Sequence, residues 1–175
     1  REYVTIHRPP FEFLKTTIGN HVLLMAFVHI GHDVIIGDRV TIANNTALSG
    51  HVQVGQGAVF SGCVLVHQFC RIGRKAMIGG LSGVDRDVIP FGIVTGDRGK
   101  LRGLNVIGLK RSGYDEGVVK SITKAFMFIF KGKEGTFEDR LAQAHEKFKD
   151  NEMVMEQVKF IDEALQGRRK IMVAE

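Results

Sequence analysis

IGNHVL-LMAFVH-IGHDVI-IGDRVT-IANNTA-LSGHVQ-VGQGAV-FSGCVL-VHQFCR-IGRKAM-IGGLSG-VDRDVI, residues 18–89, repeats one six-residue pattern without a slip in register. Each hexad begins with Ile, Leu, Val or Phe, and its fifth residue is small or β-branched. An amphipathic helix would return its apolar residues about every 3.6 positions and a half-buried strand every two, so neither explains the pattern. A hexapeptide period is typical of a parallel β-helix, in which each hexad forms one short strand and one corner.

Three hexads complete one coil of such a helix, so residues 18–89 predict four coils of eighteen residues each. Stacked coils lie about 4.7–4.9 Å apart, which is the spacing of neighbouring strands. Residues that are eighteen apart in the sequence are therefore expected to lie above one another, in columns that run along the β-helix.

The chain divides into three parts by its pattern. We assign residues 1–96 to the β-helix domain, residues 97–114 to a basic connector and residues 115–175 to a small helical domain. Within the first part, RPPFEFLKTT at residues 8–17 breaks the repeat with two prolines and is expected to leave the coil as a loop. Residues 3–6 already follow the hexad pattern, so we expect earlier coils to precede the chain.

The end of the repeat and the start of the helices are marked by single residues. Proline lacks the N–H that a continuing ladder needs, so Pro90 is expected to end the last coil. After the connector, apolar residues recur every three or four positions, which predicts a helix at about residues 115–131. Thr136 is expected to start a second helix, and Asn151 to cap a third that ends at Gly167.

Composition excludes several classes of protein. No apolar run approaches the roughly 18 residues that cross a bilayer, so we predict no transmembrane segment and a cytoplasmic protein. The net charge of +5 is concentrated in five residues of the connector, which have no acidic residue among them: Arg98, Lys100, Arg102, Lys110 and Arg111. This local patch lacks the interleaved aromatic residues of nucleic-acid-binding modules, so no nucleic-acid partner is expected.

Two columns of the predicted β-helix carry chemically active residues. Adding eighteen to His32 leads to Gly50 and then to Gln68, while adding eighteen to Asp33 leads to His51. A neutral imidazole can take a proton from a hydroxyl group, and a neighbouring carboxylate can orient it and support its positive charge. A glycine N–H can approach a developing oxyanion without obstruction. The columns therefore predict general-base acyl transfer.

A metal site is the rival interpretation of the same histidines. His29 and His32, together with His51 or His67, have the side chains that zinc prefers. The predicted columns do not bring a closed set of three ligands together within one chain, although a subunit interface can still do so. We therefore predict no metal and no cofactor.

Five segments resemble the UDP-N-acetylglucosamine O-acyltransferase family, which begins lipid A synthesis. They are HIGHD at 29–33, SGH at 49–51, VHQFC at 66–70, IGGLSGV at 78–84 and GLNVIGLKRSG at 103–113. The resemblance implies a left-handed parallel β-helix followed by a small α-helical C-terminal domain. It also implies a homotrimer with active sites between subunits, in the cytoplasm of a Gram-negative-type bacterium or in an organelle.

The resemblance also implies roles for individual residues. His32 matches the general base, Asp33 its partner and Gly50 the backbone oxyanion donor. Seven further residues match positions that contact substrates: His29, His51, His67 and Gln68 in the pocket, Gly80 at the acyl-chain groove, and Asn105 and Arg111 at the nucleotide.

Two positions depart from the family pattern. Ile107 stands where the pattern has a carboxylate, and Ser112 stands where it has a second arginine. Both residues bear on how the nucleotide is bound.

The activity implied is transfer of a long-chain 3-hydroxyacyl group from acyl carrier protein to the 3-position of UDP-N-acetylglucosamine. Acyl carrier protein is acidic, so the basic patch of the connector is a candidate docking site. Three alternatives stay open: an acyltransferase for another amino sugar, a metal-dependent enzyme of the carbonic anhydrase kind, and a non-catalytic scaffold.

Overall fold

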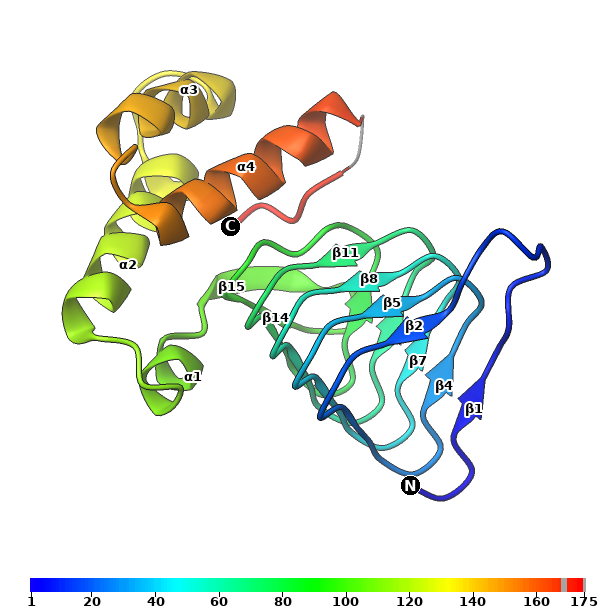
Figure 1. The fold of residues 1–175 in the computed structure, drawn as a ribbon. Helices are drawn as coiled ribbons and strands as arrows, with labels where there is room; N and C mark the ends of the chain where they lie inside the picture. Colours follow the sequence, from blue (N-terminus) through cyan, green and yellow to red (C-terminus); the bar gives the residue numbers. More distant parts are fainter. Residues whose placement is uncertain (168–169, 175) are drawn as a thin grey trace.

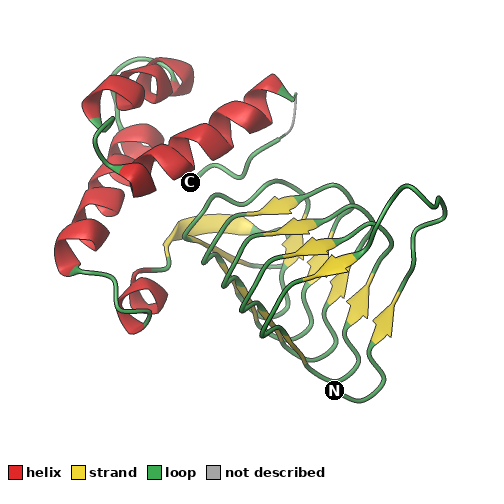
Figure 2. Cartoon of the chain, in the orientation of Figure 1, coloured by secondary structure: helices red, strands yellow, loops and turns green. Residues whose placement is uncertain are grey.

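A computed structural model describes residues 1–167 and 170–174 of the chain. The N-terminal part is a three-sided prism built of short parallel strands, and the helices lie at the end of the prism opposite the N-terminus (Figure 1). Figure 2 shows that turns, rather than strands, make up most of each coil. The predicted parallel β-helix followed by a helical domain is confirmed.

Each side of the prism is one sheet, and successive strands pass from sheet A to sheet B to sheet C. Sheet A contains β1 (Thr5–Ile6), β4 (His29–Ile30), β7 (Ala47–Leu48), β10 (Leu65–Val66) and β13 (Gly83–Val84). Sheet B contains β2 (Thr17–Ile18), β5 (Ile35–Ile36), β8 (Gln53–Val54) and β11 (Arg71–Ile72). Sheet C contains β3 (Leu23–Leu24), β6 (Thr41–Ile42), β9 (Val59–Phe60), β12 (Met77–Ile78), β14 (Gly92–Thr95) and β15 (Lys100–Leu104).

The strand register confirms the coil of eighteen residues. In sheet A, His29 lies opposite Ala47, and Ala47 lies opposite Leu65. The first coil is longer, because Thr5 pairs with His29, which is twenty-four positions further on. The extra six residues belong to the segment between β1 and β2, here called the 7–16 loop.

The two apolar positions of each hexad fill the prism. The second residue of a strand points inward, as Ile30, Ile36 and Phe60 do, each at most 1% exposed. The fifth residue of the hexad is buried as well, and its small size lets the three sheets meet at their corners, as Val34 and Val64 do. The two apolar positions of each hexad therefore repeat because they fill the narrow core of the prism.

The corners share one backbone conformation. The residue in the middle of each turn has a positive φ, for example 62° at Asp33 and 61° at His51. Its N–H donates to the carbonyl oxygen of the turn in the coil below: His51 N to His32 O at 3.0 Å, and Phe69 N to Gly50 O at 3.1 Å. These bonds tie each corner into a ladder of its own.

The last coil differs from the prediction in one respect. Pro90 does not end sheet C, because Ile93 and Val94 of β14 pair in parallel with Met77 and Ile78. The proline sits in the corner before β14, where its missing N–H interrupts no strand pairing. Strand β15 then returns antiparallel to β14.

Four helices follow: α1 (Val106–Arg111), α2 (Glu116–Lys131), α3 (Phe137–Lys147) and α4 (Glu152–Gln166). The sequence did not predict α1. The other predicted starts are confirmed: Thr136 forms a capping box with Asp139, and the Asn151 side chain accepts from Val154 N.

Charged side chains fasten α4 to the prism. Arg71 binds Glu163 at 3.0 Å, and Arg74 binds Glu156 at 2.6 Å. In the described part of the chain, no helix is long and apolar enough to span a bilayer.

Candidate active site

The site is built at the corner between sheets A and B, here called the A–B corner. His32 and Asp33 follow β4, and His32 Nδ1 lies 2.7 Å from Asp33 Oδ2. The Asp33 side chain is only 5% exposed, whereas that of His32 is 45% exposed. A carboxylate can only accept, so Nδ1 carries the proton and Nε2 is left with the lone pair of a base. The buried carboxylate therefore orients an accessible imidazole.

Gly50 and His51 occupy the same corner one coil later, as the columns predicted. A Cβ added to Gly50 would lie 2.7 Å from Nε2 and Cε1 of His32, so only glycine fits against the ring. Within the described residues, the N–H of the buried Gly50 donates to no protein acceptor. His51 Nε2 lies 3.6 Å from Asp33 Oδ2, and its ring meets that of His32 edge-on at 5.1 Å.

One carboxylate thus serves two imidazoles. Both His32 and His51 approach the same oxygen of Asp33, Oδ2. The other oxygen, Oδ1, is buried and has no partner among the described residues. Phe69 stacks on His51 with 4.7 Å between ring centroids and fixes the plane of that ring from the next coil.

His29 lies beside the corner and points to other partners. Its Nδ1 lies 2.8 Å from Thr5 Oγ1, and its ring meets that of His7 edge-on at 4.6 Å. Burial and, to a smaller extent, the charge of His7 lower the pKa of His29 below its ordinary value. The lowered pKa favours the neutral form of the His29 ring that contacts Thr5.

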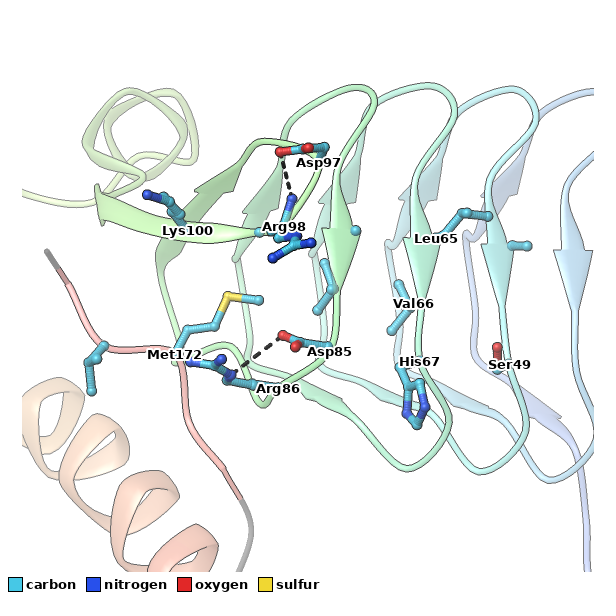
Figure 3. Close-up of a pocket in the computed structure, with 15 residues that line it drawn as sticks. Ser49, Leu65, Val66, His67, Asp85, Arg86, Asp97, Arg98, Lys100 and Met172 are labelled. Carbon is cyan, nitrogen blue, oxygen red and sulfur yellow. Dashed lines mark hydrogen bonds and ion pairs between the residues drawn. The ribbon is translucent and has the colours of Figure 1, made fainter.

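His67 and Gln68 lie at the A–B corner above Gly50. His67 Nδ1 bonds to Gln68 O at 3.1 Å, and both side chains are exposed. His67 also lines a groove of about 760 Å³ along sheet A, where Leu65 and Met172 supply apolar surface. Figure 3 shows Ser49 and His67 toward one end of this groove and Lys100 toward the other.

The remaining predicted residues lie on the other two corners. Gly80 follows β12 and is exposed at the corner between sheets C and A. Asn105 begins α1, where its side chain accepts from Gly108 N and donates to Lys75 O, at the corner between sheets B and C. Arg111 is exposed at the end of the same helix. One chain therefore does not bring all the predicted residues to one place.

The structure contradicts the expectation that no three metal ligands meet within one chain. One ligand atom each from His32, Asp33 and His51 lies within 4.8 Å of the others, which is a set of three within one chain. The sequence placed His32 and His51 in neighbouring columns. It did not show that Asp33 lies close to both rings, so the set of three was not predicted. The distance of 2.7 Å between His32 and Asp33 is that of a charge-assisted hydrogen bond, which accounts for their approach without an ion.

The basic patch of the connector is divided among elements. Lys100 and Arg102 lie on one face of β15, since they alternate with the buried Leu101. Arg98 lines the groove along sheet A together with Asp97, so it is not free of acidic neighbours.

Two residues of the corner received no role from the sequence. Phe69 stands eighteen positions after His51, so it continues the column of Asp33 and His51, but its side chain type indicated no chemistry. Thr16, whose hydroxyl oxygen accepts from Asp33 N at 2.9 Å, lies seventeen positions before Asp33 and follows a break in the repeat, so no periodicity points to it.

Known proteins resemble both parts of the chain. The profile described as "Bacterial transferase hexapeptide (six repeats)" matches residues 15–50, and that described as "Udp N-acetylglucosamine O-acyltransferase; Domain 2" matches residues 87–172. The acyl-[acyl-carrier-protein]–UDP-N-acetylglucosamine O-acyltransferase of Gloeothece citriformis is 48% identical over 131 residues, and that of Sinorhizobium fredii is 39% identical over 162 residues. The chain belongs to the UDP-N-acetylglucosamine O-acyltransferase family.

The matches cover most of this chain and part of each relative. They span 75% of this chain and 48% of the Gloeothece protein, and 92% of this chain and 60% of the Sinorhizobium protein. The chain thus spans about half to three fifths of the length of these curated members of the UDP-N-acetylglucosamine O-acyltransferase family.

Solved structures of the same family share the fold. An Arabidopsis UDP-N-acetylglucosamine acyltransferase is 39% identical, with a TM-score of 0.95 over 99% of this chain and 62% of its own. The UDP-N-acetylglucosamine O-acyltransferase of Moraxella catarrhalis is 30% identical, with a TM-score of 0.87 over 98% of this chain and 65% of its own.

Proposed function

We propose that this protein transfers an acyl group from acyl carrier protein to UDP-N-acetylglucosamine, the reaction for which its relatives are named. The observation that carries the proposal is the hydrogen bond of 2.7 Å between His32 Nδ1 and Asp33 Oδ2, with Gly50 packed against the same imidazole. This arrangement presents a base and a backbone N–H side by side. A direct transfer needs both.

The mechanism follows from these groups. His32 Nε2 takes the proton of a sugar hydroxyl as its oxygen attacks the thioester carbonyl carbon. The Gly50 N–H donates to the oxyanion that forms, and the Asp33 carboxylate stabilises the imidazolium. When the C–S bond breaks, the departing sulfur takes the proton back from Nε2. We propose the sugar 3-hydroxyl as acceptor and a long-chain 3-hydroxyacyl group as donor, in the cytoplasm.

The divided site supports a homotrimer with shared active sites. The base, the acyl-groove residue Gly80 and the nucleotide residue Arg111 lie on different corners of one prism, so joint action requires neighbouring chains. The outward residues of sheets A and C include Leu65, Leu23 and Val59, and such surface is stabilised by burial against another copy. Closed symmetry would bring an A–B corner of one copy to a different corner of the next.

Complementation tests the shared site directly. Mixed trimers of His32→Ala and Arg111→Glu chains should regain activity, in roughly a quarter of the sites under random mixing, because some interfaces then carry neither change. If each site lay within one chain, half of the chains would still lack the base and the others the arginine, and mixing would restore nothing.

A docking site for acyl carrier protein lies on the connector and the helices. Lys100 and Arg102 share one face of β15, and Lys110, Lys120 and Lys124 line a shallow groove between α1 and α2. Charge reversal at Lys100 and Arg102 should raise the KM for the acidic donor about tenfold at low salt and less at high salt. An unchanged KM at every salt concentration would remove this surface from the proposal.

The decisive measurement is a mass-spectrometric product assay on the intact protein with a panel of acyl carrier protein thioesters and UDP-sugars. Formation of acylated UDP-N-acetylglucosamine supports the proposal, whereas acylation of another amino sugar alone would redirect it to the related acyltransferases.

The set of ligand atoms at His32, Asp33 and His51 favours a metal-dependent hydratase as the second candidate function. Stoichiometric zinc in the purified protein, together with activity lost to a chelator, would establish that alternative.

A further inference from the structure

The corner ladder is interrupted under Asp33, at the A–B corner. At regular corners the N–H of the positive-φ residue donates to the carbonyl oxygen nineteen positions earlier, as Arg39 N does to Asn20 O at 2.8 Å and His51 N does to His32 O at 3.0 Å. Asp33 would need the carbonyl of Leu14 by the same count. The 7–16 loop has left the coil there, so the ladder lacks its backbone acceptor.

A side chain fills this position. The Thr16 hydroxyl oxygen accepts from Asp33 N at 2.9 Å, and the same hydroxyl donates to His7 O at 2.8 Å. Thr16 therefore closes the 7–16 loop at its base and completes the ladder under Asp33. Because the hydroxyl donates to a carbonyl, its lone pair is directed to the N–H.

The backbone that Thr16 holds determines where the Asp33 carboxylate points. Asp33 has a φ of 62°, a conformation that is uncommon for non-glycine residues and that the corner hydrogen bonds help to hold. In this conformation its Oδ2 reaches His32 Nδ1 at 2.7 Å and His51 Nε2 at 3.6 Å. A rotation of the turn would move the carboxylate away from both imidazoles.

We propose that Thr16 is a positioning residue for the His32–Asp33 pair, a role that rests on the proposed acyl transfer. It does not touch the reacting atoms, and it acts by fixing the turn that aims the carboxylate. The 7–16 loop is thereby part of the site, although its sequence carries no hexad pattern.

Thr16→Val and Thr16→Ser test this role in the intact protein. Valine keeps the shape of the side chain and removes the hydroxyl, so kcat should fall about tenfold while KM for both substrates stays within about twofold. Serine restores the hydroxyl and should restore kcat to within about threefold. The matched control is Thr46→Val, because Thr46 likewise accepts from Val64 N and donates to Ser61 O, at the corner between sheets C and A. Its kcat per folded protein should stay unchanged.

Wild-type kcat in Thr16→Val, or an equal loss of kcat in Thr16→Val and Thr16→Ser, would overturn the proposal. Amide hydrogen exchange provides a readout that needs no substrate. The Asp33 amide should be protected in the wild type and in Thr16→Ser, and should exchange at least about tenfold faster in Thr16→Val while the His51 amide stays protected. Equal protection in all three proteins would show that the hydroxyl does not hold this turn. A wild type that transfers no acyl group would instead refute the proposed function and leave the exchange result standing.

Discussion

Replacing Asp33 by asparagine isolates the charge that supports the base. Asparagine has nearly the same shape and tolerates a positive φ, so the turn with its φ of 62° should persist. The change removes the negative charge that lies 2.7 Å from His32 Nδ1. Proton transfer to Nε2 would then create an imidazolium beside a neutral amide.

The size of the effect follows from the burial of the pair. The Asp33 side chain is 5% exposed and the His32 imidazole is 45% exposed. Solvent therefore screens the interaction between their charges as it does for a pair near the protein surface. Two unit charges about 4 Å apart interact by about 4 kcal/mol at an effective dielectric constant of about 20. The imidazole carries only part of a charge in the transition state, and the amide dipole replaces part of the interaction. About 3 kcal/mol remains, which corresponds to a fall in kcat of about two orders of magnitude.

Steady-state kinetics of Asp33→Asn and Asp38→Asn check this reasoning. Asp38 lies in the same kind of turn at the corner between sheets B and C, one position before the positive-φ residue Arg39, and its Oδ1 accepts from Asn20 N at 2.7 Å. Asparagine can accept that bond, so Asp38→Asn should keep kcat within twofold. If Asp33→Asn lost less than tenfold in kcat with its fold intact, the carboxylate would not support the charge of the base.

Three further predictions concern the ring contact, the domain junction and a titration. Gly50→Ala should lower kcat at least about a hundredfold with little change in melting temperature, because the alanine Cβ would displace the His32 imidazole. Unchanged kinetics would contradict the close packing of Gly50 against that ring. Arg74→Met should lower the free energy of unfolding by about 2–4 kcal/mol in denaturant titrations. A double-mutant cycle with Glu156→Met should show a coupling energy of about 1–2 kcal/mol. Additive losses would mean that the two side chains do not stabilise the protein through their contact. His7→Gln should raise the pKa of His29 toward its ordinary value in an NMR titration, since the neighbouring charge that lowers it is gone; a further fall in the pKa would have the wrong sign.

The sequence predicted the two columns of the A–B corner because the period of the repeat also gives the positions of residues along the β-helix. One period of eighteen residues placed Gly50 over His32 and His51 over Asp33, and the structure confirms both placements through the corner ladder. The hexad pattern could do this because the same apolar positions that repeat in the sequence are the ones that fill the core.

The parts that escaped prediction are those where the chain leaves the period. The position of Thr16 depends on how the 7–16 loop closes, and no repeat encodes that closure. The approach of Asp33 to two imidazoles depends on a backbone conformation of the turn and on side-chain rotamers, neither of which a residue count contains. The expectation that Pro90 ends the last coil was wrong because the proline lies in a corner, where it interrupts no strand pairing. A proline within a strand would interrupt the pairing.

The twenty-four-residue first coil shows how a β-helix of this kind can change in length. Residues added at a corner bulge outward as a separate loop, and every later side chain keeps its inward or outward direction. A single residue added within a two-residue strand would instead reverse the facing of the side chains that follow it in that strand. Corners are therefore the natural places for peptide grafts, and the one between β1 and β2 would set a grafted segment directly beside the reactive imidazole.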